Sequence, residues 1–459
     1  MEDKKELTFF EKASNWIRNS ITLRLFTIGI LLLIMLVPVN MIESLIRERE
    51  GRQREAQNEI TAKWGYAQSI TGPVLTIPYN VFSKIYDKNE ASQYRLTTAI
   101  HYYHFLPDRL SITGTVNPEV RYRGIFEAIV YSSEIEMSGI FSQPVLNDPD
   151  IKNNLRWNEA FIATGITDLR GIQEGVKLLW NNKPGLFSPG MNTRDVIASG
   201  ISVPVEVLPA DTVQNKTYNF NIRLKFNGST NLNFVPLGKE TDVRLISPWH
   251  TPSFDGAFLP DDRKIDKSGF QAHWNILNLN RSYPQQFAGT TPGIAESAFG
   301  VTLMMPVDQY QKSMRAAKYA VLFISLTFMV FFFIQIINKV RIHPIQYILV
   351  GFALCIFYAL LISLSEHINF GFSYLISSTA IIALITFYAQ GTFKNRKLSG
   401  LLSAIMVILY GFIFTIIQLE DVALLVGSIG LLIALAIVMI VTRNIDWYNS
   451  SQFIRKKSD

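Results

Sequence analysis

The stretch that decides the fold is YAVLFISLTFMVFFFIQIINKVRIHPIQYILVGFALCIFYALLISLSEH, residues 319–367. It holds two long apolar segments separated by a short loop, and three more apolar segments follow before residue 442. The five segments are Tyr319–Ile337, Ile345–Leu364, Phe370–Gln390, Leu398–Gln418 and Val422–Val441. Each is long enough to cross a hydrocarbon core of about 30 Å at a rise of about 1.5 Å per residue. We therefore expect five transmembrane helices in the last third of the chain.

The short loops between these segments alternate in charge. The loops after the first and third segments are basic, and so is the end of the chain, with Lys339, Arg341, Lys394, Arg396, Lys397, Arg443, Arg455, Lys456 and Lys457. The loops 365–369 and 419–421 hold Glu366, Glu420 and Asp421 but no lysine or arginine. Since basic loops stay in the cytoplasm, this alternation predicts an integral membrane protein with a cytoplasmic C-terminus.

A sixth apolar segment lies near the N-terminus. Leu25–Ile42 is 18 residues without a charge, bounded by Arg24 and Glu43. A cleaved signal peptide is the alternative, but the apolar run is longer than the usual 7–15 residues and no clear cleavage site follows. We interpret it as a retained anchor. Before it, Phe9, Phe10, Trp16 and other apolar residues share one helical face, which predicts a helix in the membrane interface or an ordinary cytoplasmic tail.

Six spans place both termini in the cytoplasm and the region between spans one and two on the periplasmic side. The predicted organisation is a cytoplasmic amphipathic segment (1–24), helix 1 (25–42), a periplasmic β-rich domain with helical stalks (43–318), helices 2–6 (319–441) and a cytoplasmic tail (442–459). The basic residues near 47–54 and 312–318 oppose this orientation. Long translocated domains are largely exempt from the charge rule, so the short C-terminal loops decide it.

The region between the spans reads as predominantly β. In Thr217–Asn227, five apolar residues alternate with polar ones without a fault, which is the period of a half-buried strand. Many other short runs are separated by Gly, Pro, Asn and Asp clusters. We therefore expect a large, predominantly antiparallel, sandwich-like domain flanked by helices at Glu43–Lys63 and Asp308–Lys318. A break at Asn181–Gly190 leaves open a division into two subdomains.

The sequence offers few candidates for a catalytic, metal or cofactor site. The net charge of +6 follows from the loop residues, so we expect no nucleic-acid partner, and the single cysteine, Cys355, excludes a disulfide. No cofactor motif is present. His101 and His104 lie three apart on a predicted strand, where side chains point to opposite faces and do not share a metal. His250 with Ser253 and Asp255 gives only a weak hydrolase hypothesis.

The predicted spans three to six contain no ionisable residue, which disfavours ion-coupled transport and favours a platform for the domain outside. Small residues at helix-packing spacing predict helix–helix contacts at Gly351, Gly400, Gly427 and Gly430. After the last span, Arg443, Trp447 and Tyr448 are predicted membrane-exit anchors, since arginine reaches the headgroups and aromatic residues favour the interface.

The chain resembles the CreD family of bacterial inner-membrane proteins over nearly its whole length. The resemblance rests on separated motifs in the same order, including Tyr122-Arg123-Gly124-Ile125-Phe126, Asp168-Leu169-Arg170-Gly171-Ile172, Trp249-His250, Ser268–Trp274, Asp308–Gln311, His343–Tyr347, Ser363–His367 and Thr442–Tyr448. It implies an envelope protein linked to stress regulation and colicin tolerance, with no enzymatic activity, cofactor or catalytic residue. The N-terminal extension departs from the family pattern.

From these motifs we expect structural or partner-contact roles rather than catalysis. Arg123 and Arg170 are predicted to be buried ion-pair or hydrogen-bond partners. Gly124, Gly171 and Gly269 are predicted to meet backbone requirements. The remaining candidates are Trp249, His250 and Trp274.

Three functions remain open at this point. The first is a non-enzymatic envelope protein whose β domain binds an envelope protein while the helices anchor it in the bilayer. The alternatives are a transporter or channel for an apolar or lipid-like solute, and a membrane-bound hydrolase.

Overall fold

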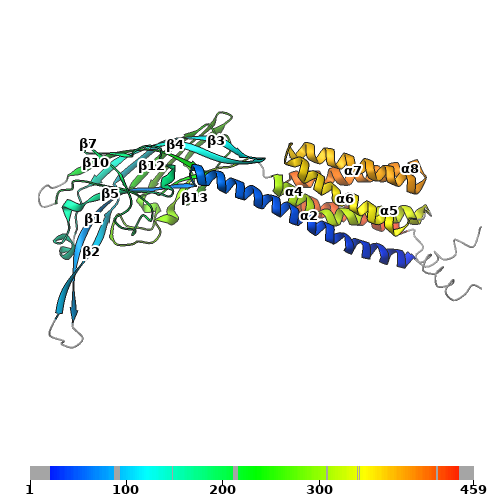
Figure 1. The fold of residues 1–459 in the computed structure, drawn as a ribbon, viewed down its shortest axis with the longest axis horizontal. Coiled ribbons are helices and arrows are strands. Elements are labelled where there is room, and N and C mark those ends of the chain that lie inside the picture. Colours follow the sequence, from blue (N-terminus) through cyan, green and yellow to red (C-terminus); the bar gives the residue numbers. More distant parts are fainter. Residues whose placement is uncertain are drawn as a thin grey trace, which may run out of the picture. The chain divides into compact units, whose positions relative to one another are not determined.

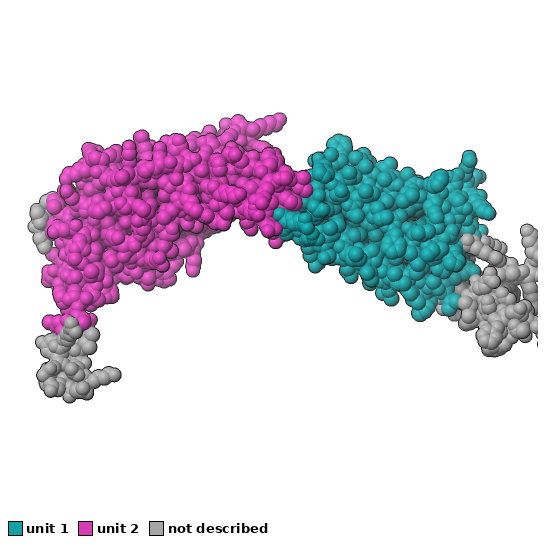
Figure 2. Space-filling model, viewed as in Figure 1, with its two compact units in different colours: residues 1–52, 307–459 teal, residues 53–306 magenta. Residues whose placement is uncertain are grey.

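A computed structural model describes residues 21–86, 94–146, 148–209, 216–305, 309–338, 340, 342–419 and 422–443 (Figure 1). The predicted amphipathic segment before residue 21 and the predicted anchors Trp447 and Tyr448 lie outside these residues. The chain forms two compact units, coloured separately in Figure 2. One comprises Met1–Arg52 and Val307–Asp459, and the other is Gln53–Pro306.

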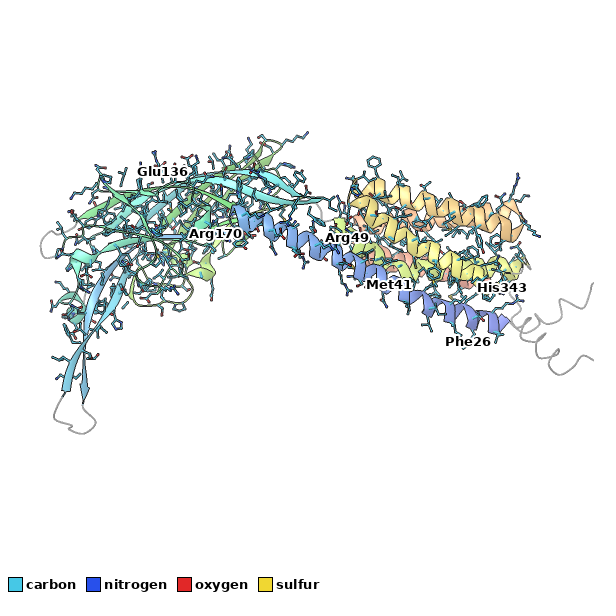
Figure 3. The ribbon with its side chains drawn as sticks, in the orientation of Figure 1. Phe26, Met41, Arg49, Glu136, Arg170 and His343 are labelled. Carbon is cyan, nitrogen blue, oxygen red and sulfur yellow. The ribbon has the colours of Figure 1, made fainter. Side chains whose placement is uncertain are left out.

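The first unit is helical. Its helices are α2 (Ile21–Trp64, which continues into the second unit), α4 (Gln309–Lys318), α5 (Ala320–Ile337), α6 (Pro344–Ser365), α7 (Phe370–Phe393), α8 (Arg396–Gln418) and α9 (Ala423–Thr442). Six of these, all except the short α4, are long and apolar enough to cross a membrane. Phe26 and Met41 project outward from α2, as expected of side chains that face lipid (Figure 3). The predicted set of one N-terminal and five C-terminal spans is confirmed.

The ends of the helices follow from local sequence. At the start of α6, the ring of His343 accepts a hydrogen bond from the Ile345 backbone at 3.3 Å, and the Gln346 side chain accepts one from the His343 backbone at 2.9 Å. Pro344 occupies the first turn, where a missing N–H costs nothing. Asn369 and Asn395 cap α7 and α8 in a similar way. The His343–Tyr347 motif therefore starts a helix.

The glycines of the helical unit divide into two groups. A Cβ added at Gly351 would lie 2.6 Å from the Met35 sulfur, so α2 and α6 approach closely there. A Cβ at Gly430 would similarly meet the ring of Phe412. Gly400 and Gly427 face open space. The predicted packing role is confirmed at Gly351 and Gly430 and is wrong at the other two.

The second unit is a two-sheet structure. One sheet has the order β13 (Pro252–Gly256), β17 (Phe299–Leu303), β11 (Asn231–Phe234), β1 (Gln68–Tyr86), β5 (Phe161–Ile166), β9 (Gly200–Pro204), β8 (Ser188–Pro189), with β2 (Tyr94–Phe105) on β1 and β16 (Gln286–Ala288) on β2. The other has the order β14 (Asp262–Asp266), β15 (Gly269–Leu277), β12 (Glu240–Ser247), β3 (Arg109–Arg123), β4 (Phe126–Ser142), β10 (Thr217–Ser229), β6 (Lys177–Trp180), β7 (Lys183–Leu186). Short helices lie at α3 (Pro149–Lys152), η1 (Trp157–Glu159), η2 (Leu169–Gly171), η3 (Asn278–Asn280) and η4 (Ala295–Ser297).

Strand pairing is mostly antiparallel, as predicted, but β1 with β11 and β12 with β3 are parallel. The parallel pairs were not visible in the sequence because their strands lie far apart in the chain. Strand β10 keeps the predicted alternation, and its apolar residues are the buried ones.

Both sheets contribute to one apolar core. The ring centre of Trp274 on β15 lies 5.6 Å from the ring centre of Phe299 on β17 and 5.7 Å from that of Phe254 on β13. The two sheets therefore meet face to face. One continuous core argues for one domain. The alternative of a division at Asn181–Gly190 is wrong. That stretch begins with the turn of the β6–β7 hairpin, where Asn181 and Asn182 have φ values of 47° and 66°.

Candidate functional site: a polar clamp at the end of α2

The most densely hydrogen-bonded group of motif residues lies where α2 ends. The indole of Trp64, the last residue of α2, donates to the Tyr131 carbonyl at 3.0 Å. The Arg121 guanidinium lies 4.6 Å from the centre of the Trp64 rings. At Gly65 the chain adopts a φ of 147° and turns into β1. The end of α2 is therefore fixed on the sandwich.

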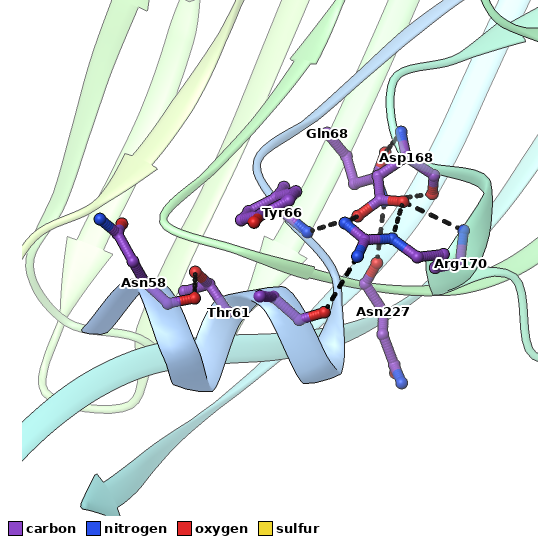
Figure 4. A network of polar contacts seen from close by, with 8 residues as sticks. Asn58, Thr61, Tyr66, Gln68, Asp168, Arg170 and Asn227 are labelled. Atoms are coloured by element: carbon purple, nitrogen blue, oxygen red, sulfur yellow. Dashed lines mark hydrogen bonds and ion pairs between the residues drawn. The ribbon is translucent and has the colours of Figure 1, made fainter. Parts of the chain in front are cut away.

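Five residues around this turn form what we call the α2 clamp: Tyr66, Gln68, Asp168, Arg170 and Asn227 (Figure 4). The Asp168 carboxylate accepts from the Tyr66 backbone at 3.0 Å and from the Arg170 backbone at 3.1 Å. It also accepts from Nε and Nη2 of Arg170, both at 2.9 Å. The hydrogen bonds from Arg170, with help from both backbone donors and against the effect of burial, hold the pKa of Asp168 below its usual value.

Arg170 extends the α2 clamp to the helix itself. Its Nη1 donates to the Ala62 carbonyl at 3.3 Å, in the last turn of α2, where carbonyls lack a partner within the helix. Its guanidinium also stacks on the Tyr66 ring at 4.9 Å. The predicted ion-pair role is present, but the prediction of burial is wrong, because the Arg170 side chain is 58% exposed. Only its carboxylate partner is shielded.

Gln68 joins the loop that carries Asp168 to strand β10. Its amide donates to the carbonyls of Asp168 at 2.9 Å and Asn227 at 3.1 Å, and its oxygen accepts from the Asp168 backbone at 3.1 Å. Gly171 lies against the same atoms. A Cβ there would be 2.3 Å from the Asn227 carbonyl oxygen, which no side chain tolerates without a shift of the backbone. The Asp168–Ile172 motif thus builds a tight joint between α2 and both sheets.

Other predicted residues lie at two further places. Arg123 pairs with Glu59 of α2, but its side chain is 51% exposed, so the prediction of burial is wrong here too. Gly124 has a φ of 61° in the β3–β4 turn. Trp249, Gly269 and Trp274 gather around β12, where the Trp249 backbone donates to the Ser247 hydroxyl and Gly269 packs on the Ser247 carbonyl. These described motif residues therefore lie at separate places on the sandwich.

The weak hydrolase hypothesis finds no matching geometry. Ser253 and Asp255 belong to β13, and the Asp255 carboxylate accepts from the Thr302 hydroxyl at 2.6 Å. The His250 ring lies beside Trp249, with ring centres 5.9 Å apart. Within the described ranges, no hydrogen bond joins His250, Ser253 and Asp255.

Comparisons with known proteins identify the family of this chain. The family model described as "Inner membrane protein CreD" matches residues 20–448. The chain belongs to the CreD family. It is 33% identical over 418 residues to the inner membrane protein CreD of Escherichia coli (strain K12), which covers 91% of each chain. The family resemblance predicted from the motifs is confirmed, and the protein is an inner-membrane protein with several membrane-spanning helices.

In this CreD-family chain, sequence reasoning missed a buried histidine network. The His104 ring is 1% exposed, and its Nδ1 lies 2.9 Å from the Thr76 hydroxyl. Its Nε2 lies 3.4 Å from the Asp195 carboxylate. Burial lowers the pKa of His104, and the Asp195 hydrogen bond opposes that effect. No local signal marks this pair, because Asp195 is 91 residues away in the chain.

A second missed group lies in the helical unit and joins two family motifs. The Tyr310 hydroxyl donates to the Glu366 carboxylate at 2.8 Å, and Nε of Arg49 lies 3.7 Å from the same carboxylate. The Glu366 side chain is only 9% exposed. Arg49 comes from α2 and Tyr310 from α4, so this carboxylate ties both helices to the end of α6. The sequence placed Glu366 in an ordinary loop.

Proposed function

We propose that this CreD-family protein is a non-enzymatic membrane protein whose β-sandwich lies in the periplasm and binds an envelope partner. In this proposal the six spans act as the anchor, and α2 connects the anchor to the sandwich through the α2 clamp. Support of envelope integrity under stress, including colicin tolerance, is the physiological role that we attach to it.

The observation that carries the proposal is the β1–β2 ribbon, which we define as Asn80–Lys84 with Leu96–Ile100. Partners from β5 and β16 contact β1 and β2 only nearer the sandwich, and the ribbon extends beyond it (Figure 1). The register pairs Asn80 with Ile100, Phe82 with Thr98 and Lys84 with Leu96. Phe82, Leu96 and Ile100 therefore share one face, and each is between 50% and 61% exposed.

A solvated two-stranded ribbon gains little stability by itself, and an exposed apolar face is costly in water. Such a face is useful when a partner covers it. At the Asn80 end the ribbon is bonded to the Asn154 carbonyl at 3.1 Å, and an extended segment can pair along the strand edges beyond that point. Both properties favour protein binding over a purely structural role.

The periplasmic orientation is supported by the loop charges. Lys394, Arg396 and Lys397 lie at the junction of α7 and α8, whereas Glu366 and His367 lie at the junction of α6 and α7. The helices α5, α6, α7 and α9 contain no aspartate, glutamate, lysine or arginine, which favours an anchor over an ion-coupled transporter.

The orientation is tested with single cysteines in a Cys355→Ala background. A membrane-impermeant maleimide added to spheroplasts should label Leu279→Cys in the sandwich and should not label Lys397→Cys until the membrane is opened. The reverse pattern would refute the periplasmic assignment.

Partner binding is tested with a photo-reactive amino acid at Leu96 or Ile100 in intact cells. Leu279 is the matched control, since it is an exposed leucine elsewhere on the sandwich. We expect a defined crosslinked product at the ribbon positions and none at Leu279. Equal background at all three positions would refute a binding role for the ribbon.

A further inference from the structure

The free edge of β2 lacks the protection that other edges of the two sheets carry. The strands that end the sheets are β13, β8, β14 and β7. Strands β13, β8 and β7 each contain a proline, and four of the five residues of β14 are charged. Prolines and charges both discourage pairing with another chain. Residues 96–100 of β2 read LTTAI and hold neither, so this part of the edge is open to a further strand.

The direction of the backbone groups along this edge follows from the pairing at its base. Strand β16 lies on the side of β2 away from β1, and there the Tyr102 carbonyl accepts a hydrogen bond from the Gly289 backbone at 3.0 Å. Alternate residues of a strand point their N–H and C=O groups to the same side, so Leu96, Thr98 and Ile100 point theirs to this side as well. Strand β16 ends before it reaches them. In the part of the chain that the structure describes, no backbone group bonds to these three residues on that side.

The free edge of β1 is less open than that of β2. The Asn80 backbone donates to the Asn154 carbonyl at 3.1 Å, and the Arg156 backbone donates to the Pro78 carbonyl at 2.8 Å. Beyond these bonds, Lys84 brings a charge to the edge of β1. Strand β2 is therefore the side of the ribbon on which a further strand fits.

We propose that the partner of the ribbon is a second copy of this chain, and that the two copies pair β2 with β2 in antiparallel orientation about Thr98. The proposal rests on the function proposed above and names the partner of the same site. A two-fold axis at Thr98 places Leu96 of each copy opposite Ile100 of the other. Because these residues all point their N–H and C=O groups outward, each opposite pair can exchange two hydrogen bonds.

The side chains of the two edges complement each other in this register. Directly opposite residues lie on one face of an antiparallel pair, so Leu96 packs beside Ile100, and Thr98 beside Thr98, of the second copy. Apolar pairs and threonine pairs both stabilise antiparallel strands, and no like charges meet. A two-fold contact also uses the same surface on both copies and closes after two. The open edge is then covered, and no fibre grows from it.

Disulfide formation between single cysteines tests this register. The full-length protein is produced in the Cys355→Ala background, or in Cys355→Ser if the alanine variant is poorly folded, and is oxidised in isolated membranes with copper phenanthroline. In Thr98→Cys the cysteine lies on the two-fold axis, where the Cα atoms of an opposite pair are about 5.5 Å apart, within the range of a disulfide. We expect a disulfide-linked dimer of this variant. Leu279→Cys, on a residue 87% exposed elsewhere on the sandwich, is the control and should stay monomeric.

Mixed copies test the register more closely. Leu96→Cys and Ile100→Cys are produced together with two different epitope tags. The two residues lie opposite each other across the axis, whereas two copies of Leu96 lie four residues apart along the strands, about 14 Å. We expect a disulfide that joins both tags in the mixture and no dimer when either variant is present alone. Equal dimer from Leu96→Cys alone, or none from Thr98→Cys, would overturn pairing about Thr98.

The photo-crosslinks at the ribbon separate this proposal from the proposed function. A product from Leu96 that contains two tagged copies supports both. A product that contains one copy and a different protein supports partner binding and overturns self-pairing, and equal background at Leu96 and Leu279 overturns both. Because Thr98 is exposed, Thr98→Lys should leave the sandwich folded, and the like charges that it brings to the axis should remove the two-copy product. Survival of that product in Thr98→Lys would overturn pairing about Thr98.

Discussion

Replacing Asp168 by asparagine gives the sharpest test of the α2 clamp. The substitution keeps the size of the side chain and removes its charge. In the wild type the carboxylate accepts four hydrogen bonds, two from backbone N–H groups and two from the Arg170 guanidinium. An asparagine offers one oxygen and turns an NH2 group towards donors. At least two of these bonds are lost.

Hydrogen bonds to charged groups contribute about 1.5–3 kcal/mol each when shielded. The Asp168 side chain is only 10% exposed, but Arg170 is 58% exposed, so water screens part of the ion pair. We therefore expect the free energy of unfolding of the β unit to fall by about 2–3 kcal/mol. The matched control is Asp262→Asn, whose side chain is 90% exposed and which should change the free energy by less than about 0.5 kcal/mol.

The measurement is urea unfolding of the detergent-solubilised full-length protein, followed by the circular dichroism of the sheets. The pH dependence gives a second readout. Because Arg170 lowers the pKa of Asp168 in the folded state, the stabilisation is complete above the usual pKa of 3.8 and is lost as the pH falls through the folded value. The gap between wild type and Asp168→Asn should therefore close in acid. An equal loss of unfolding free energy in Asp168→Asn and Asp262→Asn would refute the role of Asp168 in the α2 clamp. A difference between wild type and Asp168→Asn that does not depend on pH would refute it as well.

Three further predictions concern Gly171, His104 and the contact between Glu366 and Tyr310. Gly171→Ala should clearly lower the melting temperature of the β unit, because the added Cβ would overlap a backbone carbonyl. Gly175→Ala is the control and should leave the melting temperature unchanged, because the atom nearest to its added Cβ is 3.5 Å away. Equal melting temperatures of the two variants would contradict the crowding at Gly171. Because burial lowers the pKa of His104 in the folded protein, the free energy of unfolding of the wild type should fall as the pH drops from the usual histidine pKa of 6.5 through the lower folded value. In urea titrations of His104→Asn this loss should be smaller. Parallel pH profiles of the two proteins would contradict the predicted effect of His104. Glu366→Gln and Tyr310→Phe should couple by about 0.5–2 kcal/mol in a double-mutant cycle on the thermal unfolding of the helical unit, and additivity would show that their contact contributes nothing.

Some properties of the candidate residues were predicted correctly from the sequence, and others were not. Gly171 and Gly269 were predicted to meet backbone requirements from the motifs around them, and the structure gives the neighbouring backbone atoms that crowd each position. Arg123 and Arg170 were correctly seen as ion-pair partners, but burial was wrong for both, since a sequence does not report which side of a joint faces water. His104 with Asp195, and Glu366 with Tyr310 and Arg49, were missed because each group joins residues that are distant in the chain.

The sequence alone determined the membrane part and the type of the soluble part. Apolar segments of spanning length are forced into helices, because lipid offers no partner for backbone groups. The alternation in Thr217–Asn227 has only one solution, a strand with one buried face. Only the tertiary structure decided that β1 pairs in parallel with β11, that one core joins both sheets, and that Asp168 and Arg170 hold the end of α2. These features depend on contacts between distant segments, and no local pattern encodes which partner a strand edge or a charged side chain will meet.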